Sequence, residues 1–140
     1  MLRVIELAGG LASQFATMAL AELGADVIKV EPPDGDRLRA RREVAPDDFS
    51  FEYLNRRKRS VALDLESNEG RATLLELVAS ADAVVEDLDA KTVRRLRLSF
   101  RTLRRARPEI VVTSISSFGR SGPRAGWQAV RPTLPFRQQR

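Results

Sequence analysis

Residues 3–31 read RVIELAGGLASQFATMALAELGADVIKVE, and this stretch decides the fold. It opens with a short apolar run, breaks at two glycines and continues with apolar side chains at helical spacing to about Leu23. Ser13 is a candidate N-cap for that helix, and Gly24 stands where a helix commonly ends in a left-handed residue. A second apolar run covers residues 26–31. Strand, helix and strand in this order predict a right-handed βαβ unit and therefore a parallel sheet.

The rest of the chain continues the alternation of strands and helices. Residues 32–49 are polar and rich in proline, and they predict a long loop. Further strands are expected at 61–65, 82–86 and 109–116, with helices capped by Ser67, Asp89 and Ser99. We therefore expect an α/β fold, a Rossmann-like parallel sheet with flanking helices, in one domain over residues 1–130. Residues 131–140 have no period and two prolines, and they predict an irregular tail.

The composition excludes several kinds of chemistry. A chain of 140 residues is the size of one domain. It contains no cysteine and no histidine, which excludes disulfides, thiol nucleophiles, histidine acid–base catalysis and histidine- or thiolate-bound metals. We expect no metal site. No apolar run approaches the roughly 18 residues of a membrane span, and the first residues do not read as a signal peptide. The expected location is the cytoplasm, with no membrane contact.

Arginine dominates the charge of this chain. The net charge is +5, and 21 of the 24 basic residues are arginine, a side chain suited to bidentate contact with phosphates and carboxylates. Eight cations and no acid lie between residues 90 and 108: Lys91, Arg94, Arg95, Arg97, Arg101, Arg104, Arg105 and Arg107. Such a run is either a solvated face or a contact for an anionic partner. Aromatic residues make up only 6% of the chain, so we do not expect nucleic acid as a partner.

Parallel sheets bind ligands where their strands end, so the loops after the strands are the candidate site. The glycines at positions 9 and 10 form either a tight turn before a helix or a set of backbone N–H groups for an anion. Glu31 and Glu86 both end strands, and we expect them to be structural carboxylates paired with Lys58 or Arg59. Nothing in their spacing points to an acid–base pair.

Four blocks of sequence resemble the class III CoA-transferases, the CaiB/BaiF family. They are residues 3–10 with 23–31, residues 55–65, residues 81–88 and residues 114–123, and they follow one another in the family's order and spacing over residues 3–127. The resemblance implies that coenzyme A or acyl-CoA is a substrate rather than a tightly bound cofactor. It also implies transfer of coenzyme A between an acyl-CoA and a carboxylic acid, and a homodimer of interlocked chains in the full-length family.

The resemblance also implies a set of ligand contacts. Carried onto this chain, the residues expected to bind coenzyme A are Gly10, Leu11, Lys58, Arg59, Leu63, Glu66, Asp87, Leu88 and Arg95. Arginines at strand ends would bind the phosphates of coenzyme A, and Leu63 and Leu88 would flank its adenine. Arg37 and Arg39 are further cations that could contact the phosphates.

No catalytic residue is expected within this chain. The family's nucleophile is an aspartate placed beyond the fourth block, and its α-methylacyl-CoA racemase branch places a histidine and an aspartate there. We therefore expect a truncated or divergent N-terminal domain of the CoA-transferase family III fold, inactive by itself. The alternatives are a fragment of a racemase-like isomerase and a non-catalytic protein that binds nucleotides or an acidic partner. An isolated domain of this family is also expected to expose apolar faces and to self-associate.

Overall fold

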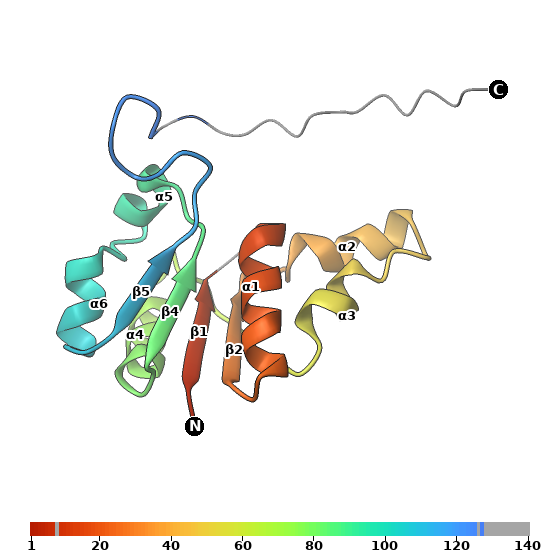
Figure 1. Cartoon of the computed structure of the whole chain (residues 1–140), viewed down its shortest axis with the longest axis horizontal. Helices are drawn as coiled ribbons and strands as arrows, with labels where there is room; N and C mark the ends of the chain where they lie inside the picture. The colour runs from red at the N-terminus through yellow and green to blue at the C-terminus, as the bar shows by residue number, and fades with distance from the viewer. Residues whose placement is uncertain (8, 126, 128–140) are drawn as a thin grey trace.

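The computed structural model describes residues 1–7, 9–125 and 127. Its five strands form one parallel sheet with the order β3-β2-β1-β4-β5 (Figure 1). The strands are β1 (Arg3–Leu7), β2 (Asp26–Glu31), β3 (Arg59–Ala62), β4 (Ala83–Glu86) and β5 (Val111–Ser114). The predicted Rossmann-like parallel sheet is confirmed. The strand order reverses between β1 and β4, so the ligand-binding crevice of this architecture lies at the carboxyl ends of those two strands.

Six helices flank the sheet. They are α1 (Leu11–Glu22), α2 (Arg37–Val44), α3 (Ser50–Asn55), α4 (Asn68–Ala79), α5 (Ala90–Arg95) and α6 (Phe100–Ala106). The three predicted caps are confirmed, because the side chains of Ser67, Asp89 and Ser99 accept backbone N–H groups at the starts of α4, α5 and α6. The predicted cap of α1 is wrong. That helix begins after Gly10, and Ser13 lies buried in its first turn.

The segment predicted as a long loop contains α2. Asp36 caps this helix by accepting the N–H of Leu38 at 2.8 Å. The helix sequence is RLRARREV, in which Leu38 is a buried apolar residue among charged ones, so no apolar period marks it. The predicted third and fifth strands are shorter in the structure, and β3 begins at Arg59 rather than at Val61.

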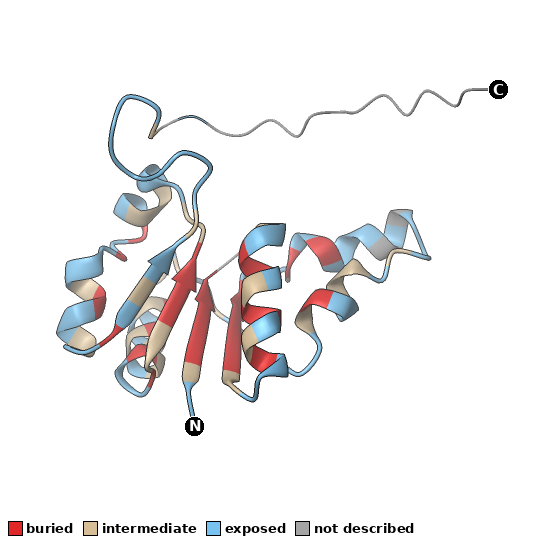
Figure 2. Ribbon diagram, viewed as in Figure 1, coloured by how far each residue is buried: buried red, intermediate tan, exposed pale blue. Residues whose placement is uncertain are grey.

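The neighbouring strands β1 and β2 are covered on both faces. Ile5 and Leu7 of β1 pack toward α4 and α6, in a core cluster with Leu74 and Leu103. On the opposite face, α1 covers the central strands, where Val4 packs, and α2 and α3 lie beside α1 (Figures 1 and 2). Strands buried on both faces explain why residues 3–7 and 26–31 read as nearly continuous apolar runs.

A buried ionic network interrupts the apolar core beneath α1. Glu6 accepts hydrogen bonds from Lys29 at 2.8 Å and from Lys58 at 2.7 Å, and Lys29 also contacts Asp36 at 2.8 Å. Lys58 donates further to the hydroxyl of Thr17 at 2.8 Å. Two acids and two bases compensate one another, which is the condition under which buried charges are tolerated. Burial holds the pKa of the Lys58 ammonium below its usual value, although Glu6 opposes that change.

The expected partners of the strand-end carboxylates are therefore wrong. Glu31 pairs with Arg39 at 2.7 Å, and Glu86 pairs with Arg120. These partners come from α2 and from the loop after β5, which approach the strand ends in space. Lys58 instead pairs with Glu6.

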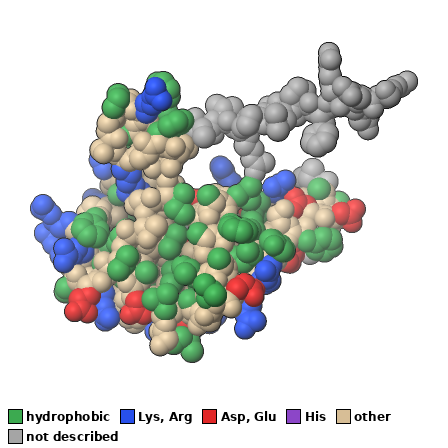
Figure 3. Space-filling view, viewed as in Figure 1, with side chains coloured by type: hydrophobic (Ala, Val, Ile, Leu, Met, Phe, Trp, Pro, Cys, Tyr) green, Lys and Arg blue, Asp and Glu red, His purple; other side chains and the backbone are tan. Residues whose placement is uncertain are grey.

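Helix α1 buries polar side chains and exposes large apolar ones. Its buried side chains include Ser13, Gln14 and Thr17, whereas Leu11 and Phe15 are exposed. Hydrophobic side chains gather on the face of the molecule viewed in Figure 3. Within the described part of the chain, no helix combines the length and apolar character needed to span a membrane.

Candidate functional site

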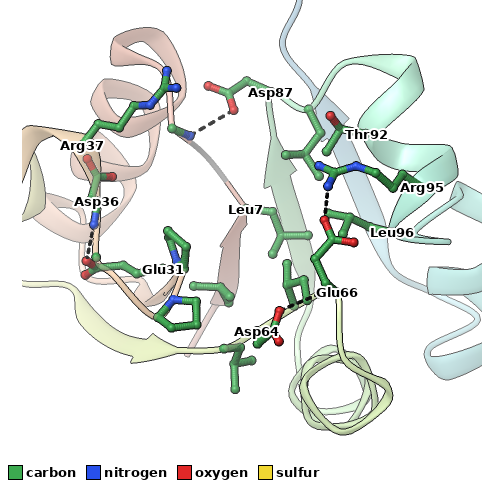
Figure 4. A pocket seen from close by; sticks show the side chains of 18 of the residues that line it. Leu7, Glu31, Asp36, Arg37, Asp64, Glu66, Asp87, Thr92, Arg95 and Leu96 are labelled. Carbon is green, nitrogen blue, oxygen red and sulfur yellow. Dashed lines mark hydrogen bonds and ion pairs between the residues drawn. The ribbon is translucent and has the colours of Figure 1, made fainter.

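A cleft of about 920 Å³ opens at the carboxyl ends of the strands (Figure 4). Its lining comes from the ends of β1 and β2, the segment after β3, the loop after β4 and helix α5. Apolar side chains contribute to its surface: Leu7, Val30, Leu63, Leu65, Leu88 and Leu96. An apolar surface with a charged rim is the usual make-up of a pocket for an organic ligand that carries charged groups.

The structure brings six of the nine predicted contact residues to this cleft. They are Gly10, Leu63, Glu66, Asp87, Leu88 and Arg95. Leu11 lines a neighbouring cavity of about 860 Å³, which shares Gly10, Asp87 and Leu88 with the cleft. The loop after β4 thus contributes to both cavities, and residues from distant parts of the sequence meet at one edge of the sheet.

Lys58 and Arg59 lie elsewhere. The Lys58 side chain is 1% exposed and belongs to the network beneath α1. Arg59 stands at the start of β3 and donates two hydrogen bonds to Asp26, at 2.9 and 2.6 Å. With Arg3, it holds the pKa of the Asp26 carboxyl below its usual range. Because parallel strands start at one edge of a sheet and end at the other, Arg59 lies at the edge away from the cleft.

Asp87 occupies the N-terminus of α1. One of its carboxylate oxygens accepts the N–H of Gly9 at 3.1 Å, and the other accepts the N–H of Gly10 and the hydroxyl of Ser13, both at 2.6 Å. A Cβ atom at Gly10 would overlap this carboxylate, so only glycine allows the approach. The two glycines therefore do present backbone N–H groups to an anion, and that anion is a side chain of the chain itself.

Most of the charged side chains around the cleft form ion pairs or hydrogen bonds within the chain. Glu31 and Arg39 form a bidentate pair at 2.7 and 2.8 Å, which holds the pKa of Glu31 below its usual range. Glu66 pairs with Arg95 across the space between the segment after β3 and α5 (Figure 4). Arg37, at the start of α2, is exposed and lines the cleft, and it forms no hydrogen bond or ion pair with any residue that the structure describes.

Two residues of the cleft lining, Asp36 and Arg37, were not among the nine predicted contact residues. Asp36 and Arg37 lie on a cleft wall because α2 occupies the segment that was predicted as a loop. An Asp two residues before an apolar Leu38 was the available signal, since Asp is a preferred N-cap residue.

The arrangement supplies groups that can bind a ligand. Across the described residues, no group of three or more acidic, histidine or cysteine side chains could hold a metal ion. The carboxylates of the cleft are held by arginines, by Lys29 or by backbone N–H groups, as in the caps made by Asp36 and Asp89. The cleft can therefore position a ligand.

Comparison with known proteins identifies the relatives of this fold and cleft. The family model described as CoA-transferase family III matches residues 2–135. This chain belongs to CoA-transferase family III. The resemblance read from four sequence blocks is confirmed.

Members of CoA-transferase family III with named activities match most of this chain. It is 41% identical over 131 residues to a succinyl-CoA:mesaconate CoA-transferase of Haloarcula hispanica, covering 89% of this chain and 33% of that protein. It is 36% identical over 130 residues to a formyl-CoA:oxalate CoA-transferase of Streptomyces coelicolor, covering 91% and 32%. The chain thus spans about a third of the length of the curated relatives it matches.

Solved structures of the family share the fold. A CaiB/BaiF family protein from Brucella suis superposes with a TM-score of 0.82 at 36% identity, covering 91% of this chain and 35% of that one. A hypothetical protein from Mycobacterium tuberculosis superposes with a TM-score of 0.82 at 32% identity, covering 92% and 36%. The similarity extends over the whole sheet and its helices.

Proposed function

We propose that this chain binds coenzyme A and acyl-CoA in the cleft at the carboxyl ends of its strands. It would supply the nucleotide-binding part of an enzyme that transfers coenzyme A between an acyl-CoA and a carboxylic acid. The observation that carries the proposal is the convergence of six predicted contact residues on one cleft of a CoA-transferase family III domain. The transferase names of the relatives favour this reading over the racemase branch.

Binding of the thioester is the part of that reaction assigned to this chain. Leu63 and Leu88 offer apolar surfaces on which the adenine ring can lie, and Arg95 stands at the rim. Coenzyme A carries a pyrophosphate and a 3′-phosphate, for which guanidinium groups are the strongest side-chain donors. Transfer would need a carboxylate nucleophile, and the carboxylates that line the cleft are held by cations or by backbone N–H groups, so we expect no turnover by this chain alone.

Calorimetric titration with coenzyme A tests the proposal. We expect saturable binding by the wild-type chain, weaker binding by Leu63→Asp and Arg95→Ala, and unchanged binding by Arg101→Ala, a variant of an exposed arginine on α6 outside the cleft. Absence of heat with the wild-type chain would remove the binding proposal. Thioester turnover by the isolated chain, measured with succinyl-CoA and mesaconate, would show that transfer needs no residues outside this chain.

A further inference from the structure

We propose that Arg37 is the principal phosphate-binding residue of the cleft, in place of the helix N-terminus that usually serves this purpose. The proposal rests on the proposed function, because it assigns a role within the coenzyme A site. It concerns a residue outside the contact set that the family resemblance implies. Three features support this role: Asp87 occupies the usual phosphate position, Arg95 is paired with Glu66, and hydrogen bonds hold the backbone that carries Arg37.

The usual phosphate position is closed by Asp87. In doubly wound sheets a phosphate commonly binds at a helix N-terminus at the switch point, where backbone N–H groups and the helix dipole favour an anion. Here the N–H groups of Gly9 and Gly10 already donate to the Asp87 carboxylate at 3.1 and 2.6 Å. A phosphate brought to this position would lose those donors to Asp87 and would meet a like charge at close range.

Arg95, the other cation in the cleft lining, and the nearby Arg39 both form ion pairs. Arg37 and Arg95 are the two basic residues among those that line the described cleft. Arg95 pairs with Glu66, so a phosphate must compete with a carboxylate for it. Arg39 is held by both oxygens of Glu31. Of the two cations that line the cleft, Arg37 is the one to which a phosphate can bind without breaking an ion pair seen among the described residues.

The backbone around Arg37 is fixed before any ligand arrives. The preceding residue, Asp36, is buried, donates its N–H to Glu31 at 3.0 Å and contacts Lys29 at 2.8 Å. The following residue, Leu38, is buried and donates its N–H to the Asp36 carboxylate at 2.8 Å. Only the side chain of Arg37 must be ordered on binding, which limits the entropic cost of the contact.

The positions of the charged side chains in the cleft determine where we place the parts of coenzyme A. Figure 4 shows Arg37 and Arg95 on opposite sides of the cleft, with Asp87 between the two walls at the end of β4. We place a phosphate of coenzyme A against Arg37 on the α2 wall. The uncharged pantetheine arm passes near Gly10 and Asp87, where a carboxylate repels phosphate and accepts amide N–H groups.

Titration of Arg37→Ala with coenzyme A and its fragments tests the assignment. Loss of a charge-assisted hydrogen bond is worth about 1.5–3 kcal/mol, so affinity for coenzyme A should fall by about 10- to 100-fold. If Arg37 binds the 3′-phosphate, the Arg37→Ala variant should also bind adenosine 3′,5′-bisphosphate more weakly than wild type does. If Arg37 binds the pyrophosphate, the variant should bind inorganic pyrophosphate more weakly. Pantetheine should be unaffected. Arg37→Lys should recover part of the affinity, because lysine keeps the charge without the planar fork.

Arg101→Ala is the matched control, since Arg101 is also exposed and lies outside the cleft. Equal, small effects of Arg37→Ala and Arg101→Ala on coenzyme A affinity would overturn the role of Arg37 and leave the proposed function standing. If the wild-type chain binds one of the phosphate fragments but not coenzyme A, the proposed function fails, and the fragment titrations still decide the role of Arg37. Binding of none of these ligands by the wild-type chain would overturn both proposals.

Discussion

The carboxylate of Glu6 lies 2.8 Å from the ammonium of Lys29, with both side chains at most 1% exposed. Glu6 comes from β1 and Lys29 from the neighbouring β2, at positions that are paired in the parallel register. Lys58 and Asp36 extend this pair to the segment before β3 and to the start of α2. The network thereby connects the sheet to the wall that presents Arg37, so the stability of the core and the shape of the cleft depend on the same buried charges.

Lys58→Met should lower the free energy of unfolding by about 3 kcal/mol, because removing one member of a buried charge set leaves an incompletely compensated charge. Glu6 would keep Lys29 alone as its cation. Urea unfolding followed by circular dichroism measures the change. Lys91→Met, at an exposed position on α5, is the matched control and should change stability by less than about 0.5 kcal/mol. Equal losses for the two variants would show that the buried network does not stabilise the fold.

The pair of Glu31 and Arg39 should make part of the stability dependent on pH. Arg39 holds the pKa of Glu31 in the folded state below its usual value of 4.5. Because that folded-state pKa is lowered, the stabilisation is present above pH 4.5 and is lost as the pH falls through the lower, folded value.

Arg39→Ala should therefore be less stable than wild type near neutral pH, and the difference should shrink below pH 4.5. Urea midpoints of the two proteins across this pH range measure it, with Arg101→Ala as a control that keeps the pair. A difference that stays constant down to the acid limit would contradict the assignment.

Gly70→Ala should destabilise the start of α4 and disturb the cleft. A Cβ atom at position 70 would lie 2.7 Å from the carbonyl carbon of Asp64, and backbone cannot move aside as a flexible side chain can. Overpacking of this kind costs about 1–3 kcal/mol. The displaced segment carries Leu63 and Glu66, so coenzyme A affinity should fall together with the melting temperature. Gly9→Ala, where a Cβ meets nothing within 4 Å, should keep its melting temperature. The same melting temperature for both variants would refute the close approach.

Local sequence patterns predicted the parallel sheet and three helix N-caps, because the signals for strands and caps lie within a few neighbouring residues. Apolar runs marked β1 and β2, and the preferences of Ser67, Asp89 and Ser99 marked three helix starts. The rule that parallel strands end at one edge of a sheet predicted which edge carries the cleft. These predictions needed no knowledge of which distant residues meet.

Contacts between distant residues could not be read in the same way. Lys58 and Glu6 are 52 positions apart, and the sequence offered several carboxylates at similar positions on strands. Helix α2 escaped detection because its stability comes from the cap and the buried contacts of Leu38, not from an apolar stripe. The closure of the α1 N-terminus by Asp87 joins residues 77 and 78 positions apart, and only the folded chain shows it.

The apolar outer face of α1 should make the isolated chain self-associate. Phe15 is 55% exposed on this helix, whereas the polar side chains of Ser13, Gln14 and Thr17 are buried. This arrangement is expected of a helix that packs against further protein on its outer side. Phe15→Ser should therefore lower the weight-average sedimentation coefficient at high protein concentration while leaving unfolding free energy within about 0.5 kcal/mol of wild type. Phe100→Ser is a close match, because Phe100 is an equally exposed phenylalanine on the arginine-rich surface of α6, and it should leave the association unchanged. A wild-type chain that sediments as a sharp monomer at all concentrations, or an equal effect of the two substitutions, would show that the outer face of α1 does not drive association.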